Sequence, residues 1–575
     1  MRLLLIALCL SLVSVHGGDL SLSCRTPLDS KVKIQITSWL RQRPSVGFMP
    51  LRVTIQNGTT SAGTILLSRT DRRGGRSIFF SQEFSVPASN ERSFEVMLPI
   101  GAGGTGGYYD TITISGMGIN SEVNLPIDTS GGAVEPYSRY LAVSDSLHIR
   151  SWNGISSGLS SENQEVIGCA VDPMTAPTDW RGYTGLAQWW MTGEEWQKIP
   201  KASKSALLEW VALGGEIMMI CAKVDAASLE ALALPGGSRL VQLYGKGRID
   251  VAEAAKNGGV PNEAISFQRQ RSGKLNIEKS VNTHKIGKWM NEIVGILQMR
   301  GWLIFLFIIA FAVVVGPVNL FVLAGKGRRA RLFWTTPLIS LIGSLLLALI
   351  ILFEDGTGGV GAQLIHVTLM PDEKKIAITQ EQTSRTGLLL SSNFAIAEPS
   401  LMQPMASKFV EDYRRSPYDR SGSENWSCTP GSRFGDWFRS RSVQSHLLQA
   451  VRPSRAAIEL TTGSTPHVVS TIDAELKVLY LIDDADKVWK AEAVATGEKH
   501  DLQPSSIQEL RDWLTQIRSD VAPGTIVSKG LTDELPRSGS IYAEAADGAG
   551  FAISTLSSIH WKQRKAFITG PYVTR

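Results

Sequence analysis

Two uncharged stretches on either side of a short basic one determine how this chain is arranged. They read WLIFLFIIAFAVVVGPVNLFVLA (Trp302–Ala324), GKGRRAR (Gly325–Arg331) and LFWTTPLISLIGSLLLALIILF (Leu332–Phe353). At about 1.5 Å of rise per residue, each uncharged stretch is long enough to cross the roughly 30 Å hydrocarbon core of a bilayer. The sequence therefore predicts a membrane hairpin, with the lipid bilayer as a partner.

The orientation of this hairpin follows from its charges. Lys and Arg resist translocation, so the basic link 325–331 is expected in the cytoplasm, between spans 302–324 and 332–353. The N-terminus agrees with this orientation, because Arg2 precedes an apolar run from Leu3 to Val15 and the small or aliphatic residues of a cleavage site follow. We interpret residues 1–17 as a signal peptide, and we expect both large flanking regions to be extracytoplasmic.

The composition sets limits on the class of protein. A chain of 575 residues, 43% hydrophobic and 19% charged, predicts three or four domains. Its net charge of +5 is small for this length, so no polyanionic partner is indicated, and the compartment excludes nucleic acid. The cysteines expected in the mature chain are few and widely spaced, which argues against a disulfide scaffold. They are Cys24, Cys169, Cys221 and Cys428.

Two regions with different patterns of apolar and polar residues precede the hairpin. Residues 31–135 alternate between apolar and polar positions in short runs such as Val32–Ile36 and Leu51–Ile55, which predicts a β-sandwich. The glycine-rich stretch Gly101–Gly107 leads into a strand and not a helix, so we interpret it as a hairpin loop and not as a nucleotide site. Residues 140–285 alternate between apolar strands and helices, which predicts a mostly parallel sheet covered on both faces.

A resemblance to a known family rests on three motifs. They are ALLEWV followed by GGEI (206–217), GPVNLF with FWTTP in the hairpin (316–337), and DWFRSR (436–441). These stretches resemble uncharacterised bacterial membrane proteins that have a class I glutamine amidotransferase-like domain followed by a two-span hairpin. The resemblance implies a Rossmann-like α/β domain and a location in the bacterial inner membrane, and it implies architecture more than activity.

Active amidotransferases of this fold resemble triad enzymes, with a Cys on a glycine-flanked elbow and a downstream His. Here Cys221 follows Met219-Ile220 and precedes Ala222-Lys223, so the glycines are missing. His284 is the only His between Cys221 and the first span. Ser156 lies in a G-x-S-x-G match, Gly154–Gly158, which follows a polar segment and not a strand, and we interpret it as a loop. Cys221 and Ser156 are therefore weak catalytic candidates.

Other site chemistry is sparse in the sequence. The eight His are scattered singly and no Walker A or C-x-x-C pattern occurs, so we expect no cofactor and no protein metal site. Five tryptophans crowd into one part of the α/β region and favour core packing over a recognition surface for a glycan or a protein. They are Trp180, Trp189, Trp190, Trp196 and Trp210.

Beyond the second span we expect two further units. Residues 360–470 indicate a β-rich domain interrupted by a long polar loop at 413–435, and residues 471–575 indicate a small α+β or β-rich unit. Arg439, Arg441 and Arg452 near Asp436 are candidates for an anion-binding patch, with surface ion pairs as the alternative. The predicted fold class is thus a multidomain α/β and all-β membrane protein.

Within the first span, Pro317 lacks the N–H that would bond an earlier carbonyl, which predicts a kink around residues 313–317. Asn319 is a candidate for pairing with Thr335 or Thr336 of the second span. Two functional hypotheses follow from the whole sequence. One is a non-enzymatic, membrane-anchored envelope protein that binds or scaffolds a protein partner, and the other is a hydrolase or amidase that uses Cys221 or Ser156.

Overall fold

The computed structural model describes most of the chain outside the N-terminus. The described residues are 20–22, 24, 30–44, 47–73, 76–100, 110–125, 139–160, 166–234, 240–271, 288–295, 301–325, 327, 329–405, 422–428, 432–435, 437–463, 466–521, 527 and 536–575. The expected signal peptide, Gly101–Gly107 and His284 lie outside the described residues.

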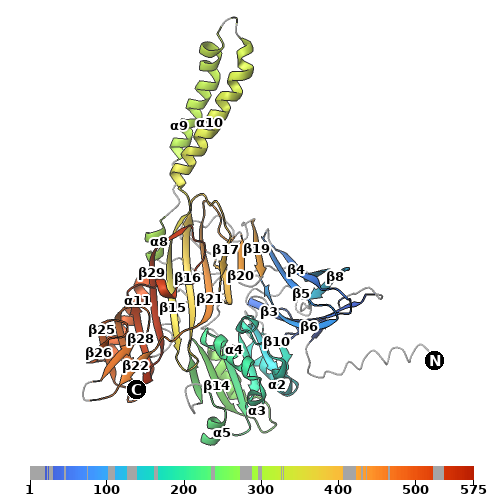
Figure 1. Ribbon diagram of the computed structural model, residues 1–575. Helices are drawn as coiled ribbons and strands as arrows, with labels where there is room; N and C mark the ends of the chain where they lie inside the picture. The colour runs from blue at the N-terminus through green and yellow to red at the C-terminus, as the bar shows by residue number, and fades with distance from the viewer. Residues whose placement is uncertain are drawn as a thin grey trace, which may run out of the picture.

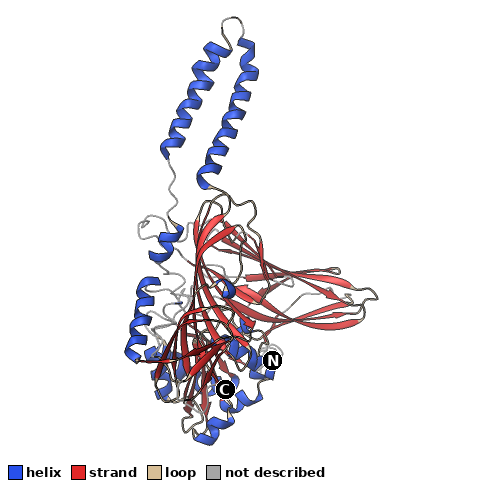
Figure 2. Cartoon of the chain, turned by 60° about the vertical axis from the view of Figure 1, so that its left-hand side comes forward, coloured by secondary structure: helices blue, strands red, loops and turns tan. Residues whose placement is uncertain are grey.

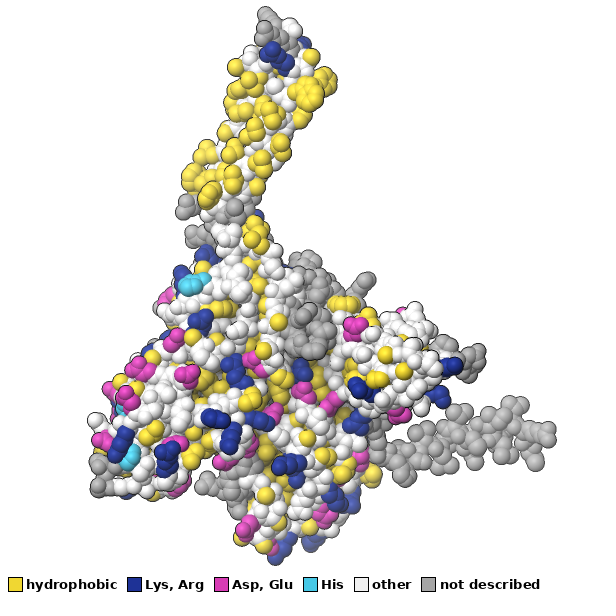
Figure 3. Space-filling view, in the orientation of Figure 1, with side chains coloured by type: hydrophobic (Ala, Val, Ile, Leu, Met, Phe, Trp, Pro, Cys, Tyr) yellow, Lys and Arg dark blue, Asp and Glu magenta, His cyan; other side chains and the backbone are white. Residues whose placement is uncertain are grey.

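Two long apolar helices rise from the body of the molecule (Figures 1 and 2). The first consists of α9 (Gly301–Val313), which continues as a π-helix, η3 (Val314–Leu323), and the second is α10 (Leu332–Asp355). Both are long and apolar enough to cross a membrane, over Gly301–Leu323 and Arg329–Ile350. Hydrophobic side chains cover their surface in Figure 3. Exposed apolar surface on this scale marks a contact with a membrane or with another protein.

The π-helix contains both residues that the sequence singled out in the first span. Pro317 lies inside it, where the wider turns relieve the clash between the proline ring and the preceding turn. Asn319 is buried and its Nδ2 donates to Thr336 Oγ1 at 2.9 Å. The expected pairing of Asn319 with the second span is therefore confirmed, with Thr336 as the partner, whereas Thr335 bonds its own helix at the carbonyl of Arg331.

The first unit after the N-terminus is a β-sandwich with its own apolar core. One sheet has the order β1-β2-β3-β6, formed by Leu20–Leu22, Val32–Ser38, Gly47–Asn57 and Asn90–Ile100. The facing sheet contains β5-β4-β7-β8, formed by Arg76–Val86, Gly63–Arg73, Asp110–Gly116 and Ile119–Leu125. Strict alternation of buried and exposed side chains in β2 and β8 gives each sheet one core face.

The second sandwich sheet is extended by strands that follow the two apolar helices in the chain. β19 (Gly422–Cys428) pairs in parallel with β5, and β20 (Ser432–Gly435) and β17 (Phe394–Ile396) continue the sheet. The expected long loop at 413–435 was therefore wrong for residues 422–428 and 432–435. Polar residues without an apolar alternation gave no local indication of a strand, because the pairing partner lies far away in the sequence.

The α/β unit is a six-stranded sheet with the order β10-β9-β11-β12-β14-β13, in which only β13 is antiparallel. These strands are Val166–Val171, Arg139–Ser144, Gln188–Thr192, Glu216–Cys221, Gly247–Glu253 and Val241–Tyr244. Helices α2 (Asp145–Leu159) and α6 (Asn262–Arg271) cover one face. Helix α4 (Lys201–Ala212) packs on the other face, with α3 (Gly193–Lys198) and α5 (Ala226–Ala231) nearby. The predicted parallel sheet with two covered faces is thus confirmed.

A nine-stranded sheet forms the centre of the body (Figure 1). Its order is β18-β21-β16-β15-β29-β28-β24-β25-β27. The strands are Ser400–Met405, Val443–Pro453, Lys375–Thr386, Gly359–Met370, Ile559–Pro571, Ser540–Ala545, Leu476–Ile482, Val488–Val494 and Gln503–Ser505. Strands from both sides of residue 470 thus belong to one sheet, so the expected unit boundary there falls inside a single hydrogen-bonded structure.

Smaller elements complete the body. Helix α11 (Ile507–Val521) packs beside the sheet, and Ser506 caps it by accepting from the Glu509 N–H at 3.1 Å. A four-stranded sheet has the order β26-β23-β22-β30, formed by Lys499–Asp501, His467–Ser470, Ile458–Thr461 and Val573–Thr574. Helix α8 (Lys288–Val294), which precedes the first span, packs on β15 and β16 through Met290.

The Asn319–Thr336 bond predicts how the two helices hold together. Asn319→Leu should weaken their association by roughly 0.6–2 kcal/mol, because a hydrogen bond within lipid is lost. Thr336→Val should have a similar effect, and the double variant should cost no more than either single one. Crosslinking between cysteines placed on facing turns of the two helices measures this association. Unchanged crosslinking in Asn319→Leu would show that the bond does not hold the helices together.

Candidate functional site

The carboxyl edge of the parallel sheet is the place where a doubly wound fold normally binds its ligand. β9 lies between β10 and β11, so the chain moves to one side of β9 and then returns to the other. In open α/β sheets, ligands bind outside the carboxyl ends of the strands at such a switch point. Here the point is bordered by Asp145 at the start of α2, by Asp172 after β10, and by Thr192 before α3.

A segment of the β-sandwich occupies this edge. Trp39 Nε1 donates to the carbonyl of Asp172 at 3.0 Å, and Tyr140 Oη donates to the carbonyl of Gln42 at 2.6 Å. The Arg41 guanidinium lies 3.7 Å from the Asp145 carboxylate. Trp39 and Arg41 therefore contact the carboxyl ends of β10 and β9, while Gln42 lies nearer the amino end of β9.

The same segment replaces a helix on one face of the sheet. The connection between β10 and β11 contains only the short helices η1 (Pro173–Thr175) and η2 (Trp180–Tyr183). The Trp39 ring packs edge-on against Tyr183 and Trp189, with centroids 5.5 and 5.1 Å apart. Because all three side chains are buried, the α/β core is complete only when the sandwich is docked.

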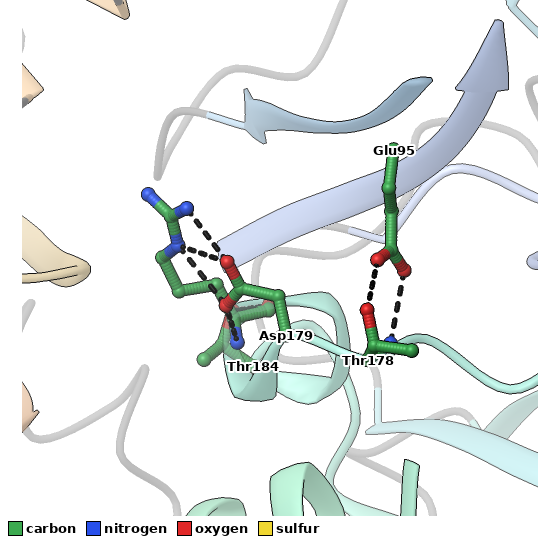
Figure 4. A network of polar contacts seen from close by, with 5 residues as sticks. Glu95, Thr178, Asp179 and Thr184 are labelled. Atoms are coloured by element: carbon green, nitrogen blue, oxygen red, sulfur yellow. Dashed lines mark hydrogen bonds and ion pairs between the residues drawn. The ribbon is translucent and has the colours of Figure 1, made fainter. Parts of the chain in front are cut away.

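A second set of contacts fastens the two units together (Figure 4). The Glu95 carboxylate on β6 accepts from both the N–H (3.0 Å) and the hydroxyl of Thr178. The Phe48 N–H donates to Thr184 Oγ1 at 3.1 Å. Gly47 adopts φ +82°, and a Cβ there would lie 2.7 Å from the Gly185 nitrogen, so only glycine permits this approach.

The edge is acidic and contains one neutralising cation. Burial raises the pKa of Asp145, the Arg41 charge opposes that rise, and Asp172 and Glu195 add to it. Glu195 is already engaged, because it caps α3 through Thr192 and accepts from Ser146 Oγ at 2.8 Å. Among the described residues no three His, Cys, Asp or Glu side chains are arranged to hold a metal ion. A cluster of this composition repels anionic ligands.

Cys221 ends β12 beside the N-terminus of α3. Its side chain is buried, and a Cβ added to Gly193 would lie 2.8 Å from its sulfur. Burial raises the pKa of the thiol, and a hydrogen bond from the Gly193 N–H lowers it by a smaller amount. Within the described part of the chain this thiol makes no hydrogen bond with a His. The geometry is that of a protonated, packed cysteine.

Ser156 lies in the second half of α2, so the interpretation of Gly154–Gly158 as a loop was wrong. A nucleophile elbow needs a sharp turn between a strand and a helix, which this regular helix does not provide. The glycine has another role, since a Cβ on Gly158 would lie 2.4 Å from Cγ2 of Ile265. Gly158 thus allows α2 and α6 to pack closely over the sheet.

The tryptophan cluster belongs to the core, as the sequence favoured. Every member is at most 4% exposed, so none forms a recognition surface. The indole of Trp196 donates to the carbonyl of Leu232 at 3.0 Å, and that of Trp190 donates to Gln188 Oε1 at 3.0 Å. Trp210 contacts the Tyr183 ring with centroids 5.9 Å apart.

The three candidate arginines do not share one patch. Arg439 and Arg441 precede β21, whereas Arg452 lies near its far end, roughly 30 Å away at about 3.3 Å per strand residue. Arg452 pairs with Glu398 at 2.6 Å and donates to the carbonyl of Ala552 at 3.3 Å. Asp436 lies outside the described residues. The arginines therefore belong to opposite ends of the central sheet.

A second polar cluster, which the sequence did not indicate, lies where the α/β unit meets the central sheet. The Lys246 ammonium is buried without a hydrogen-bond partner, and so are His366 Nδ1 and Thr379 Oγ1. Burial lowers the pKa of Lys246 to about 7 although the nearby Glu381 carboxylate raises it, and burial and Lys246 together lower that of His366. Lys246 stands between two glycines in the turn from β13 to β14, which in sequence is a surface hairpin signal.

Comparisons with known proteins add little. No family model matches the chain, and no curated protein matches it. A Paenibacillus sp. cycloisomaltooligosaccharide glucanotransferase in complex with cycloisomaltoheptaose is 10% identical, with a TM-score of 0.16 over 32% of this chain and 27% of that one. The yeast delta-COP-I mu-homology domain with a Dsl1 WxWxV peptide is 8% identical, with a TM-score of 0.15 over 38% of this chain and 98% of that one. At these TM-scores neither protein carries an argument.

The state of Cys221 predicts its reactivity. At about pH 7.5, iodoacetamide should modify Cys221 much more slowly in the native protein than after unfolding, because the thiol is buried and protonated. Mass spectrometry of the Cys221 peptide measures this rate. The partly exposed Cys24 serves as an internal comparison in the same sample. Native modification of Cys221 faster than Cys24 would indicate a thiolate and contradict the assignment.

The Lys246 site predicts a pH dependence of stability. The folded protein holds this amine with a pKa of about 7, whereas the unfolded chain keeps the ordinary value near 10.4, so the unfolded state binds more protons between the two values. Stability contributed by this group should therefore rise with pH from about 7 to 10, by at most about 1.4 kcal/mol per pH unit.

Lys246→Met is the matched control, because it keeps the stem and removes the titrating amine. The difference in free energy of unfolding between the wild type and this variant should change with pH in that window and be flat elsewhere. A constant difference across the window would show that Lys246 titrates normally in the folded protein.

Proposed function

We propose that this chain is a membrane-anchored scaffold or binding protein of the bacterial envelope and that its α/β unit works without catalysis. The observation that carries the proposal is the contact of Trp39 and Arg41 with the carboxyl edge of the parallel sheet. An enzyme of this fold needs that edge open to substrate, whereas a scaffold gains a rigid contact from it.

The two catalytic candidates support the same conclusion. The Cys221 thiol is buried with a raised pKa, and Ser156 lies within a helix. A hydrolase or amidase that uses either residue is the alternative function, and it requires the edge to open. The sandwich would have to leave the sheet and expose the Trp39, Tyr183 and Trp189 rings, which costs several kcal/mol of apolar burial at about 25 cal/mol per Å².

The proposed location rests on the hairpin and its charges. The link between the two apolar helices contains four cations in seven residues, which supports a cytoplasmic loop and a body on the opposite side of the inner membrane. The body has several separate surfaces formed by the sandwich, the α/β unit and the C-terminal strands. A protein partner in the envelope would be bound by one of these surfaces, while the bilayer holds the hairpin.

Locking the sandwich onto the sheet distinguishes the two functions. Glu95→Cys with Thr178→Cys, bridged by a short bifunctional maleimide, would prevent the edge from opening, because these side chains are in direct contact. We expect the locked protein to bind its partner, identified by affinity isolation from solubilised membranes, as well as the unlocked protein does. We also expect Cys221→Ser and Ser156→Ala to complement a deletion.

The matched control is Glu95→Cys alone, treated with the same reagent. If locking abolishes function while this control retains it, the edge must open and the scaffold proposal is wrong. Failure of Cys221→Ser at normal protein abundance would in turn favour the hydrolase.

A further inference from the structure

A loop of three leucines lies beside the point where the second membrane helix enters the body. Leu390 is 88% exposed and Leu388 is 39% exposed, whereas Leu389 between them is partly buried against the core. A single exposed leucine on a protein surface needs no explanation, but two that flank an anchoring one form an outward-facing apolar edge. We refer to Leu388–Leu390 as the leucine loop.

Backbone hydrogen bonds hold the leucine loop to the end of the second helix. The Leu388 N–H donates to the carbonyl of Gly356 at 2.9 Å, and the Gly358 N–H donates to the carbonyl of Leu388 at 3.0 Å. Gly356 directly follows the last residue of α10. The loop therefore cannot move away from the membrane exit without breaking these bonds.

The depth of the loop follows from the helix geometry. Phe353 is the last apolar residue of α10 and is 84% exposed, as expected at the boundary of the hydrocarbon core. Gly356 lies three residues further, roughly 5 Å at 1.5 Å per residue, and the interfacial layer extends about 5–8 Å beyond the hydrocarbon on each side. The leucine loop is thus at the level of the lipid headgroups.

Two arginines accompany the leucines at this end of the body. The Arg441 N–H donates to the carbonyl of Gly387 at 2.9 Å, and the Leu389 N–H donates to Ser440 Oγ at 2.9 Å. Arg439 and Arg441 are both partly exposed. Apolar side chains next to cations are the composition of a surface that binds a bilayer containing anionic lipid.

We infer that the leucine loop inserts into the bilayer that holds the hairpin, and that Arg439 and Arg441 contact lipid phosphates beside it. The inference rests on the proposed membrane anchorage and adds a third contact with the membrane. Two helices alone allow the body to swing on its connections, whereas a third contact fixes its orientation. Figure 1 shows the hairpin leaving the body at the end where β15, β16 and β21 meet it.

Nitroxide labels on single cysteines test the inference. Leu390→Cys, Ile149→Cys and Leu345→Cys are made in the full chain with Cys24 and Cys428 replaced by Ser, and each protein is reconstituted into nanodiscs of phosphatidylcholine and phosphatidylglycerol. Ile149 is 74% exposed on α2, which is away from the hairpin, and Leu345 is 58% exposed on α10. Collision with oxygen, which concentrates in lipid, is compared with collision with a water-soluble nickel complex.

We expect the label at position 390 to fall between those at 149 and 345, with more oxygen collision and less nickel collision than at 149. If 390 instead resembles 149 while 345 is in lipid, the leucine loop does not insert, although the hairpin still does. If 345 is itself accessible to nickel, the membrane anchorage fails and the inference fails with it. The label at 149 shows the behaviour of an exposed apolar site in water.

The lipid composition tests the arginines. Arg439→Gln with Arg441→Gln should reduce oxygen collision at position 390 in discs that contain phosphatidylglycerol and leave it unchanged in pure phosphatidylcholine. Inorganic phosphate added to the phosphatidylcholine discs should have no effect, which separates a lipid phosphate from the free ion. Equal values in both kinds of disc for the wild type and the variant would overturn the role of the arginines.

Discussion

The parallel pairing of β15 with β29 is the interaction on which the rest of the structure depends. β15 follows the second apolar helix directly, and β29 lies in the last part of the chain. Their pairing continues from Gly359 to Thr368, and His366 bonds Thr569 at 2.8 Å across it. Parallel strands need a crossover connection, and here the crossover contains every element from β16 to β28. Formation of the β15–β29 pair therefore arranges all the elements from β16 to β28 around β15.

The same strand connects the two apolar helices to the body. Helix α8 precedes the first apolar helix in the chain. It packs on β15 and β16, where Thr383 Oγ1 donates to the Met290 sulfur at 3.3 Å. The chain thus leads from one face of the central sheet into the apolar helices and returns into that sheet. On the α/β side, Lys375 binds Glu209 and Gln449 donates to the carbonyl of Leu213 at 3.2 Å. The sandwich in turn contacts the α/β unit through Trp39 and Glu95. The α/β unit therefore links the sandwich to the central sheet.

The local features of this fold were predictable from the sequence and the long-range ones were not. The capping box at Thr192 and Glu195, the apolar strand ending at Cys221 and the buried tryptophans all follow from patterns within a few residues. The pairing of β19 with β5 left no such pattern, because its partners are separated by hundreds of residues. Ser156 was placed in a loop because its motif follows a polar segment and not a strand, whereas in the structure it lies in α2, where Gly158 packs on Ile265.

At the candidate site, too, local features were predictable from the sequence and long-range contacts were not. The sequence identified Cys221 as a weak catalytic candidate, but not that Arg41 and Trp39 of another unit lie against the carboxyl edge of the parallel sheet. Likewise, the sequence grouped Arg452 with Arg439 and Arg441, whereas the length of β21 puts Arg452 at the other end of the central sheet. Contacts between units depend on docking geometry, which periodicity and propensity do not contain.

Hydrogen exchange followed by mass spectrometry on the full chain in nanodiscs tests most directly whether the central sheet is one structure. We predict that amides in β15 and β29 exchange in the same, slowest class, together with those of β16, because opening either strand breaks the pairing of the other. Fast exchange of residues 476–571 while residues 359–453 stay protected would show two independent units and contradict the account.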